Sequence, residues 1–290
     1  MGSCVVVLPA ARPDLSALVR LSGGPPLTRF APSPTGYLHL GHVVNAIYVW
    51  GVARALGGRV VLRIEDHDRV RCRAPYEAAL LEDLDWLGFV PDEGRHPPDR
   101  QSDRLTGFAD ALARLARDGR VYACDCSRKR VGSRPYDGRC RDRGLPRDPR
   151  RGLRVRLDNE PSGDILVRDR DGHWTYQFAV TVDDLCQGIT LVVRGQDLAD
   201  STGRQLALAG LLGRQTPPAF LHHPLIVDPT GRKLSKSAHD TGVRELRAAG
   251  LAPSAVVGLA AAAVGLIEAP APIPAGSVAV LFATPRSYLG

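Results

Sequence analysis

Strand-length and helix-length segments alternate through the first half of this chain. The expected strands are 27–31 and 59–64, and the expected helices are 41–56, 74–87 and 102–117. Strand–helix–strand–helix order favours a parallel sheet, because parallel neighbours need a long crossover that is usually a helix. The chain is therefore expected to adopt an α/β fold built on a parallel sheet.

The second half continues the pattern after an irregular stretch. Strand-like runs are expected at 152–157, 165–168, 174–182, 189–194 and 220–227, and helices at 198–212, 243–249 and 253–267. These elements predict five segments. They are an N-terminal extension (1–26), the first half of the sheet domain (27–119), a basic insertion (120–156), the second half of the sheet domain (157–240), and a short helical C-terminal region (241–290).

Composition narrows the class of protein. The 290 residues are 44% hydrophobic and 24% charged, which excludes a mostly disordered chain and allows one large domain or two small ones. The longest apolar run, 255–267, is shorter than the roughly 20 residues of a membrane span and contains two glycines. The apolar patch 5–8 follows no basic residue, unlike a secretory signal. We expect a cytoplasmic protein without a membrane partner.

Basic charge is concentrated in one segment. The chain carries 38 basic and 31 acidic residues, and 120–156 alone holds 13 basic and 4 acidic ones. The remainder is close to neutral, so the segment predicts a local anionic partner, most often a nucleic acid. The alternative is a solvated loop in an arginine-rich protein.

The first chemical motif is His39-Leu40-Gly41-His42, at the start of the helix expected at 41–56. Backbone amides at a helix start favour anions, and two histidines add side-chain donors. Gly41 lets a ligand approach the backbone closely. The alternative is a pair of incidental surface histidines.

The second motif is Lys233-Leu234-Ser235-Lys236-Ser237, in a polar loop. The chain has 35 arginines and only three lysines, and two of the three lie in this pentapeptide. A compact ammonium suits a phosphate charge that moves during a reaction better than a planar fork does. The alternative is chance clustering in a loop.

Three of the six cysteines, Cys124, Cys126 and Cys140, lie within 17 residues. Without a secretion signal, this spacing favours a metal over disulfides. A structural zinc site needs four ligands, and no histidine lies between His96 and His173. The fourth ligand is therefore an oxygen or a residue distant in sequence. The alternative is three buried free thiols.

Taken together, the motifs resemble those of a known family. RFAPSPTGYLHLGH (29–42) resembles the first signature of the class I glutamyl- and glutaminyl-tRNA synthetases, and KLSKS (233–237) resembles the second. RIED (63–66), YQFAVTVDD (176–184) and VRGQD (193–197) match further family stretches in order. The resemblance implies a Rossmann-like class I synthetase catalytic domain with an inserted zinc-binding subdomain.

The resemblance also implies an activity. Such enzymes join an amino acid to ATP to give an aminoacyl-adenylate and pyrophosphate. The implied substrates are L-glutamate and ATP, the latter with Mg²⁺. His39, His42, Lys233 and Lys236 are then the catalytic phosphate contacts, with Gly41 also against ATP. The implied glutamate contacts are Arg29, Ala31, Ser33, Glu65, Tyr176 and Arg194. The alternatives are a helix cap for His42, and a salt bridge to Arg63 or Arg69 for Glu65.

Departures from the full-length enzymes point to a side branch. Only 53 residues follow Ser237, fewer than a helical anticodon-binding region needs, and Gln177 and Gln196 replace the usual Asn and Glu. The outline resembles the shorter glutamyl-Q tRNA(Asp) synthetase family, which glutamylates queuosine in the anticodon of tRNA(Asp). The implied partner is the tRNA(Asp) anticodon stem-loop, with 120–156 as its phosphate-contact surface.

That shorter family also has Cys-x-Cys and a tyrosine four residues before the last cysteine. The resemblance therefore implies one structural Zn²⁺ held by Cys124, Cys126, Tyr136 and Cys140. We expect a monomer. Two other functions remain open: a truncated enzyme that charges tRNA(Glu), and a non-catalytic tRNA-binding paralogue. A zinc-ribbon module that binds nucleic acid does not explain why the two phosphate motifs occur together.

Overall fold

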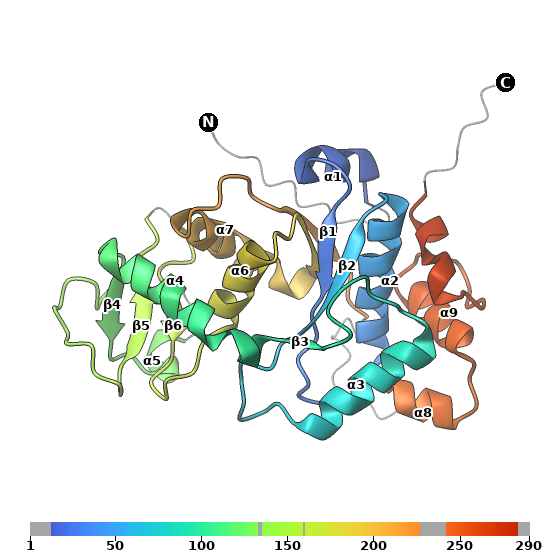
Figure 1. The fold of residues 1–290 in the computed structure, drawn as a ribbon, viewed down its shortest axis with the longest axis horizontal. Helices are drawn as coiled ribbons and strands as arrows, with labels where there is room; N and C mark the ends of the chain where they lie inside the picture. Colours follow the sequence, from blue (N-terminus) through green and yellow to red (C-terminus); the bar gives the residue numbers. More distant parts are fainter. Residues whose placement is uncertain (1–12, 133–134, 159, 227–241, 284–290) are drawn as a thin grey trace.

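The structure is a computed structural model that describes residues 13–132, 135–158, 160–226 and 242–283. A parallel sheet with its helices forms one part of the molecule, and a small antiparallel sheet lies at the opposite end (Figure 1). Within the described residues, no helix is both long enough and apolar enough to cross a bilayer.

The parallel sheet is built from strands far apart in sequence. Strands β1 (Leu27–Phe30), β2 (Arg59–Ile64) and β3 (Asp99–Arg100) pair in parallel in that order. A second parallel pair is formed by β7 (Leu191–Gly195) and β8 (Ala219–His223). The amide of Thr190 donates to the carbonyl of Leu27 over 2.9 Å, which brings β7 alongside β1. The predicted α/β fold with a parallel sheet is confirmed.

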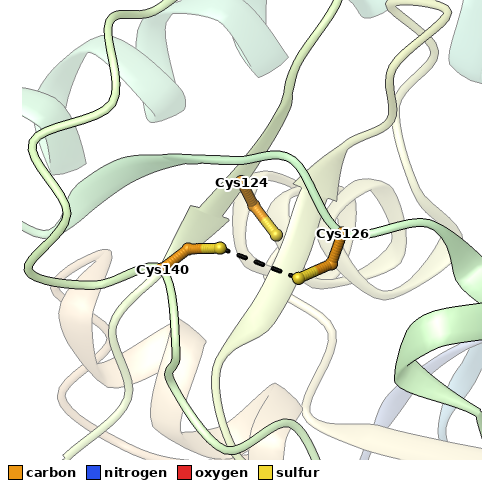
Figure 2. Close-up of side chains that lie close together, drawn as sticks. All are labelled: Cys124, Cys126 and Cys140. Carbon is orange, nitrogen blue, oxygen red and sulfur yellow. Dashed lines mark hydrogen bonds between the residues drawn. The ribbon is translucent and has the colours of Figure 1, made fainter.

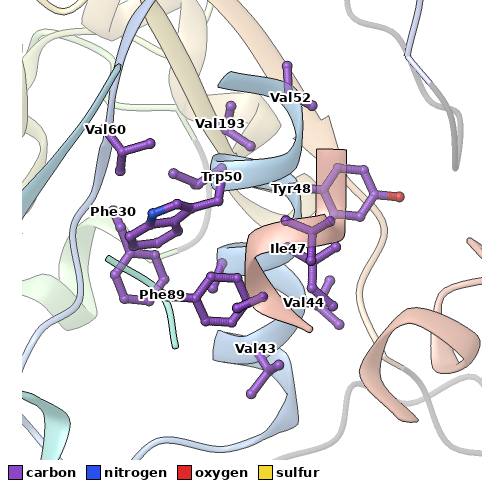
Figure 3. Packing of buried hydrophobic residues seen from close by; sticks show 14 of the residues in the cluster. Phe30, Val43, Val44, Ile47, Tyr48, Trp50, Val52, Val60, Phe89 and Val193 are labelled. Atoms are coloured by element: carbon purple, nitrogen blue, oxygen red, sulfur yellow. The ribbon is translucent and has the colours of Figure 1, made fainter. Parts of the chain in front are cut away.

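Helix α2 (Leu40–Ala55) crosses the centre of the core. It is apolar on nearly every side, as expected for a helix buried all round. Figure 3 shows its aromatic contacts: the Trp50 ring lies 5.2 Å from that of Phe30 and 5.1 Å from that of Phe89. The indole N–H of Trp50 donates to the carbonyl of Val90 over 2.9 Å, so its polar atom is satisfied. This packing fixes α2 against the sheet.

Other helices surround α2 in the same half of the molecule (Figure 1). They are α3 (Ala74–Leu87), α8 (Val243–Ala248), α9 (Pro253–Ala263) and the 3₁₀ helix η3 (Ala275–Leu281). The predicted helix 253–267 ends early because Gly265 takes a left-handed conformation, with φ 72°.

The antiparallel sheet consists of β4 (Val121–Cys124), β5 (Gly152–Val155) and β6 (Ile165–Arg168). Its core includes the rings of Phe108, Trp174 and Phe178. The neighbouring elements are the 3₁₀ helices η1 (Gln101–Arg104) and η2 (Gln196–Ser201) and the helices α4 (Leu105–Arg117), α5 (Arg128–Val131), α6 (Tyr176–Cys186) and α7 (Thr202–Leu211). The basic segment 120–156 supplies two of the three strands, and β6 continues the sheet beyond it.

One predicted element is wrong. The segment 174–182 alternates large apolar and polar residues and was expected to be a strand, but most of it belongs to helix α6. Phe178 and Val182 lie one helical turn apart and both pack into the core beside the antiparallel sheet. Burial of this helical face overrides the β-propensity of its aromatic and branched residues.

The N-terminal extension also contains structure that its weak pattern did not predict. Helix α1 (Leu15–Ser22) is capped by Asp14, whose carboxylate accepts from the amide of Ala17 at 3.0 Å. Gly23 ends it in the left-handed conformation, with φ 75°, and Leu18 packs in the main core.

Candidate active site and metal centre

A cavity of about 310 Å³ opens where the parallel strands end and α2 begins. Residues from the ends of β1, β2, β7 and β8 line it, in the crevice where open parallel sheets bind ligands. Of the residues predicted to bind substrate, eight line this cavity: Arg29, Ala31, His39, Gly41, His42, Glu65, Tyr176 and Arg194. Ser33 is not among the lining residues, and Lys233 and Lys236 lie outside the described residues.

The two histidines cap the start of α2. Nδ1 of His39 accepts from the amide of Gly41, and Nδ1 of His42 accepts from the amide of His39, each at 3.1 Å. The capping role considered for His42 is therefore present. Because Nδ1 accepts in both neutral rings, the ring proton belongs on Nε2, which makes Nε2 a donor suited to an anion. A Cβ at position 41 would lie 2.8 Å from Cε1 of His39, so any larger residue would displace the His39 ring from its capping position.

Arg29 is held from behind by protein oxygens. Its Nε donates to Oδ1 of Asp184 at 2.9 Å, and Nη1 donates to the carbonyl of Val193 at 3.3 Å. Nη2 has no hydrogen-bond partner among the described residues. Burial pushes the pKa of Asp184 upward, but Arg29 and Arg63 outweigh burial and hold that pKa below its usual range. Arg29 can therefore offer an edge of its guanidinium to a carboxylate in the cavity.

Arg194 has most of its donors occupied. Nη1 donates to Oε1 of Gln205 at 2.6 Å, and Nη2 donates to Oγ1 of Thr202 at 2.8 Å and to the carbonyl of Leu198 at 3.0 Å. Nε lies 3.3 Å from Nε2 of His222. A guanidinium has five N–H bonds, so Arg194 keeps fewer for a ligand than Arg29 does.

Glu65 and Tyr176 complete the charged wall. Oε1 of Glu65 accepts from Nη2 of Arg63 at 3.0 Å, so the salt bridge considered as an alternative does form. Oε2 of Glu65 has no hydrogen-bond partner in the described part of the chain. Burial, followed by Glu65, raises the pKa of Tyr176 to about 12, so its hydroxyl remains a donor at neutral pH. The cavity thus has a cationic side at Arg29 and Arg194 and an anionic point at Glu65.

Asn45 and His223 are among the cavity residues that sequence reasoning missed. Nε2 of His223 lies 3.2 Å from Oδ1 of Asn45, and its ring stacks on Tyr48 at 5.1 Å. Side chains alternate across a strand, so His223 faces α2 while its neighbour His222 faces Arg194. The tandem histidines at the end of an apolar run were the available signal.

A separate cluster brings three cysteines together (Figure 2). The sulfurs of Cys126 and Cys140 lie 3.7 Å apart, and one ligand atom from each of the three cysteines falls within 4.8 Å of the others. The hydroxyl oxygen of Tyr136 lies 3.5 Å from the sulfur of Cys124 and 4.0 Å from that of Cys126. Zn–S bonds of about 2.3 Å in a tetrahedron place sulfurs about 3.8 Å apart. The spacing therefore fits four ligands around one small metal ion.

A buried positive charge beside this cluster, on Arg154, also supports a bound metal ion. Arg154 is buried, with 6% of its surface exposed, and no carboxylate in the described part of the chain forms a salt bridge with it. Its Nε donates to the sulfur of Cys124 at 3.3 Å, and its guanidinium carbon lies 3.7 Å above the centre of the Tyr136 ring. A buried cation needs an anionic partner. Thiolates bound to a metal supply one, whereas neutral thiols do not.

Much of the positive charge in 120–156 is neutralised locally. Its salt bridges are Arg120–Asp158, Arg139–Asp137, Arg141–Asp164, Arg143–Asp125, Arg150–Asp148 and Arg156–Asp158. Lys129, Arg130 and Arg147 are exposed and have no salt bridge among the described residues. The basic surface open to an anion is therefore narrower than the sequence predicts.

Comparisons with known proteins follow the same outline. Residues 27–137 and 142–262 match the family described as tRNA synthetases class I (E and Q), catalytic domain. A glutamyl-Q tRNA(Asp) synthetase of Rhodobacter capsulatus is 39% identical over 273 residues, covering 79% of this chain and 97% of the relative. A glutamate–tRNA ligase 1 of Alkalilimnicola ehrlichii is also 39% identical, but the match covers only 55% of it.

A solved structure gives the same result at the level of the fold. The glutamate-tRNA synthetase of Elizabethkingia anophelis superposes with a TM-score of 0.70 at 25% identity, over 87% of this chain and 64% of that enzyme. This chain thus spans slightly less than two thirds of that enzyme's length.

Proposed function

The chain belongs to the glutamyl-Q tRNA(Asp) synthetase family of class I tRNA synthetases, and from this premise we propose that it activates L-glutamate with ATP and transfers the glutamate to queuosine in the anticodon of tRNA(Asp). The observation that carries the proposal is the cavity at the start of α2. It combines cationic, anionic and helix-terminal groups in the arrangement that an amino acid and a nucleotide need.

Activation forms one bond and breaks another. The α-carboxylate of glutamate attacks the α-phosphorus of ATP, the bond to the β-phosphate breaks, and pyrophosphate leaves with glutamyl-adenylate as the product. The residues position ligands and stabilise charge rather than bond to them. His39 and His42 contact the phosphates through Nε2, and Gly41 lets ATP approach α2. Mg²⁺ accompanies ATP and offsets phosphate charge.

The loop that carries Lys233 and Lys236 completes the phosphate site. Lys236 stabilises the charge that develops on the departing pyrophosphate, and Lys233 is a second phosphate contact. Both assignments depend on the sequence motif.

Glutamate recognition uses the charged wall. Arg29 binds the side-chain carboxylate with the guanidinium edge that Asp184 leaves open, and Arg194 and Tyr176 add donors beside it. Glu65 binds the ammonium through Oε2. Ala31 lies between these points on the cavity wall, and Ser33 is the contact with least support because it is not a lining residue.

We further propose that Cys124, Cys126, Cys140 and Tyr136 hold one structural Zn²⁺. When bound, the ion would cross-link the segment 120–156, which has few large apolar residues, and would supply folding energy there. It has no part in catalysis, because four protein ligands leave no open position. The segment is then a zinc-binding subdomain between the two halves of the catalytic domain, 27–119 and 157–240.

Transfer requires the anticodon stem-loop to reach the cavity. A nucleophilic group of queuosine attacks the acyl carbon of the adenylate, and AMP leaves. Lys129, Arg130 and Arg147 are the phosphate contacts that their exposure and lack of salt bridges support best. The protein acts as a monomer.

The experiment measures both steps. Glutamate-dependent ATP–pyrophosphate exchange without RNA tests activation, and exchange with glutamine or aspartate but not glutamate would contradict the substrate. Mass spectrometry of anticodon nucleosides then tests transfer to tRNA(Asp) with and without queuosine. Charging of tRNA(Glu) instead would favour the truncated-synthetase alternative, and absence of both reactions would favour the non-catalytic paralogue.

A further inference from the structure

Arg63, on β2, is a fully buried guanidinium surrounded by carboxylates. Its Nη2 donates to Oε1 of Glu65 at 3.0 Å, and Nη1 donates to Oδ1 of Asp184 at 2.8 Å. Nε lies 3.9 Å from Oδ2 of Asp183. Buried charges persist only when they are paired, so these contacts are needed for the fold to hold Arg63 in place.

The contacts of Arg63 extend to both charged points of the cavity. The same oxygen of Asp184 that accepts from Arg63 also accepts from Nε of Arg29, at 2.9 Å. Arg29, Asp184, Arg63 and Glu65 thus form an unbroken chain of alternating charge. The two ends of this chain, Arg29 and Glu65, both line the cavity. Each has one polar atom with no hydrogen-bond partner among the described residues: Nη2 in Arg29 and Oε2 in Glu65.

Arg63 cannot adjust freely within this chain. Its guanidinium is planar and rigid, and Nη1 is fixed further by donating to Oε1 of Gln187 at 2.7 Å. None of its side-chain surface is exposed, so no contact can be exchanged for water. Backbone pairing aligns β1 with β2, but the separation of the Arg29 and Glu65 side chains depends on the groups between them.

We propose that Arg63 is a positioning residue that sets the distance between Arg29 and Glu65, and thereby selects an amino acid with the side-chain length of glutamate. The inference rests on the proposed function, in which these two residues bind the side-chain carboxylate and the ammonium. Aspartate is one methylene shorter and cannot reach both points in their fixed positions. Glutamine has the right length but lacks the charge that Arg29 requires, so its rejection does not depend on Arg63.

The test compares amino-acid specificity in ATP–pyrophosphate exchange. Arg63→Lys keeps the charge, but a point charge cannot hold Glu65 and Asp184 at a fixed spacing. We expect kcat/KM for glutamate to fall about 10- to 100-fold, mainly through KM, and the preference for glutamate over aspartate to fall about 10-fold or more. The preference for glutamate over glutamine and the KM for ATP should both stay within about 3-fold of the wild-type values.

Arg104→Lys is the matched control. Arg104 pairs with Asp183 at 2.8 Å in the same ionic cluster, but contacts neither Arg29 nor Glu65. It should lower thermal stability without changing the glutamate-to-aspartate preference. Asp184→Asn is the second variant if Arg63→Lys does not fold. It keeps the shape of the Asp184 side chain but weakens its bonds to Arg29 and Arg63, so it should also lower the preference for glutamate over aspartate.

The outcomes separate the two proposals. A wild-type protein that does not activate glutamate would remove the proposed function and this inference with it. A wild type that prefers glutamate, with folded Arg63→Lys or Asp184→Asn variants that keep the full preference over aspartate, would overturn the inference alone. An equal loss of preference in Arg104→Lys would also overturn it, by showing a general effect of the cluster.

Discussion

The Nε atom of Arg194, a residue of the cavity wall, lies 3.3 Å from Nε2 of His222, and both side chains are buried. A guanidinium can only donate, so Nε2 of His222 must accept and the ring must be neutral. Burial, then Arg194 and then His223, lowers the pKa of His222 to about 4. The position of Arg194 therefore depends on an uncharged histidine.

This relationship predicts acid sensitivity. The pKa of His222 is about 4 when folded and 6.5 in its ordinary state, so between these values the unfolded chain binds more protons. The free energy of unfolding should therefore fall as the pH drops from 6.5 towards 4, by on the order of 2 kcal/mol. Urea unfolding at pH 7 and pH 5 would measure the difference. His222→Gln should flatten the dependence; an equal slope in both proteins would contradict the prediction.

Arg29→Ala should remove glutamate use. The change leaves Asp184 without one of its two arginines and the side-chain carboxylate without its main donor, so kcat/KM for glutamate should fall at least about 100-fold. The KM for ATP should change little, because the histidines at the start of α2 lie on other elements. Exchange kinetics with each substrate varied in turn would show this, and a wild-type response to glutamate would exclude the assigned role.

Lys236→Ala should lower kcat for adenylate formation about 100-fold while KM for ATP changes less, because the contact is strongest in the transition state. The residue lies outside the described part of the structure, and the prediction depends on the scarcity of lysine in the chain. Lys236→Arg is the sharper variant. Full activity of that variant would mean that any cation serves.

Tyr136→Phe should weaken zinc binding. It keeps the ring under Arg154 but removes the oxygen that lies 3.5 Å from the sulfur of Cys124. Elemental analysis should find one zinc per wild-type chain. After the same chelator treatment, the variant should retain less zinc than the wild type, while its glutamate activation survives at least in part. Zinc absent from the wild type, or retained equally by both proteins, is the result that removes the four-ligand proposal.

Arg154→Met should also weaken zinc retention, because it removes the buried cation beside the thiolates. A loss of about 10-fold in apparent affinity is expected in competition with a chromogenic chelator. Arg150→Met is the matched control, since Arg150 is exposed, pairs with Asp148 and contacts none of the proposed zinc ligands among the described residues. Equal losses in the two variants would argue against a specific role for Arg154.

Local pattern accounts for what the sequence predicted well. The strand at 59–64, the helix at 74–87 and the strand at 165–168 have the predicted bounds, because periodicity and flanking turn residues act over a few positions. The histidines at a helix start and the cysteine cluster were also visible, since the members of each group lie within 17 residues of one another. The strand expected at 174–182 was wrong because core packing, not local alternation, makes it helical.

The sequence by itself determined which chemical groups the protein contains and the order of most of its strands and helices along the chain. Tertiary structure alone decided which of those groups are paired. Asp184 meets Arg29 across 155 positions and Arg63 across 121, and nothing in the local sequence of Asp184 signals either contact. The physical reason is that a buried charge is stabilised by whichever partner folding brings within a few ångströms, whereas sequence pattern records only neighbours along the chain.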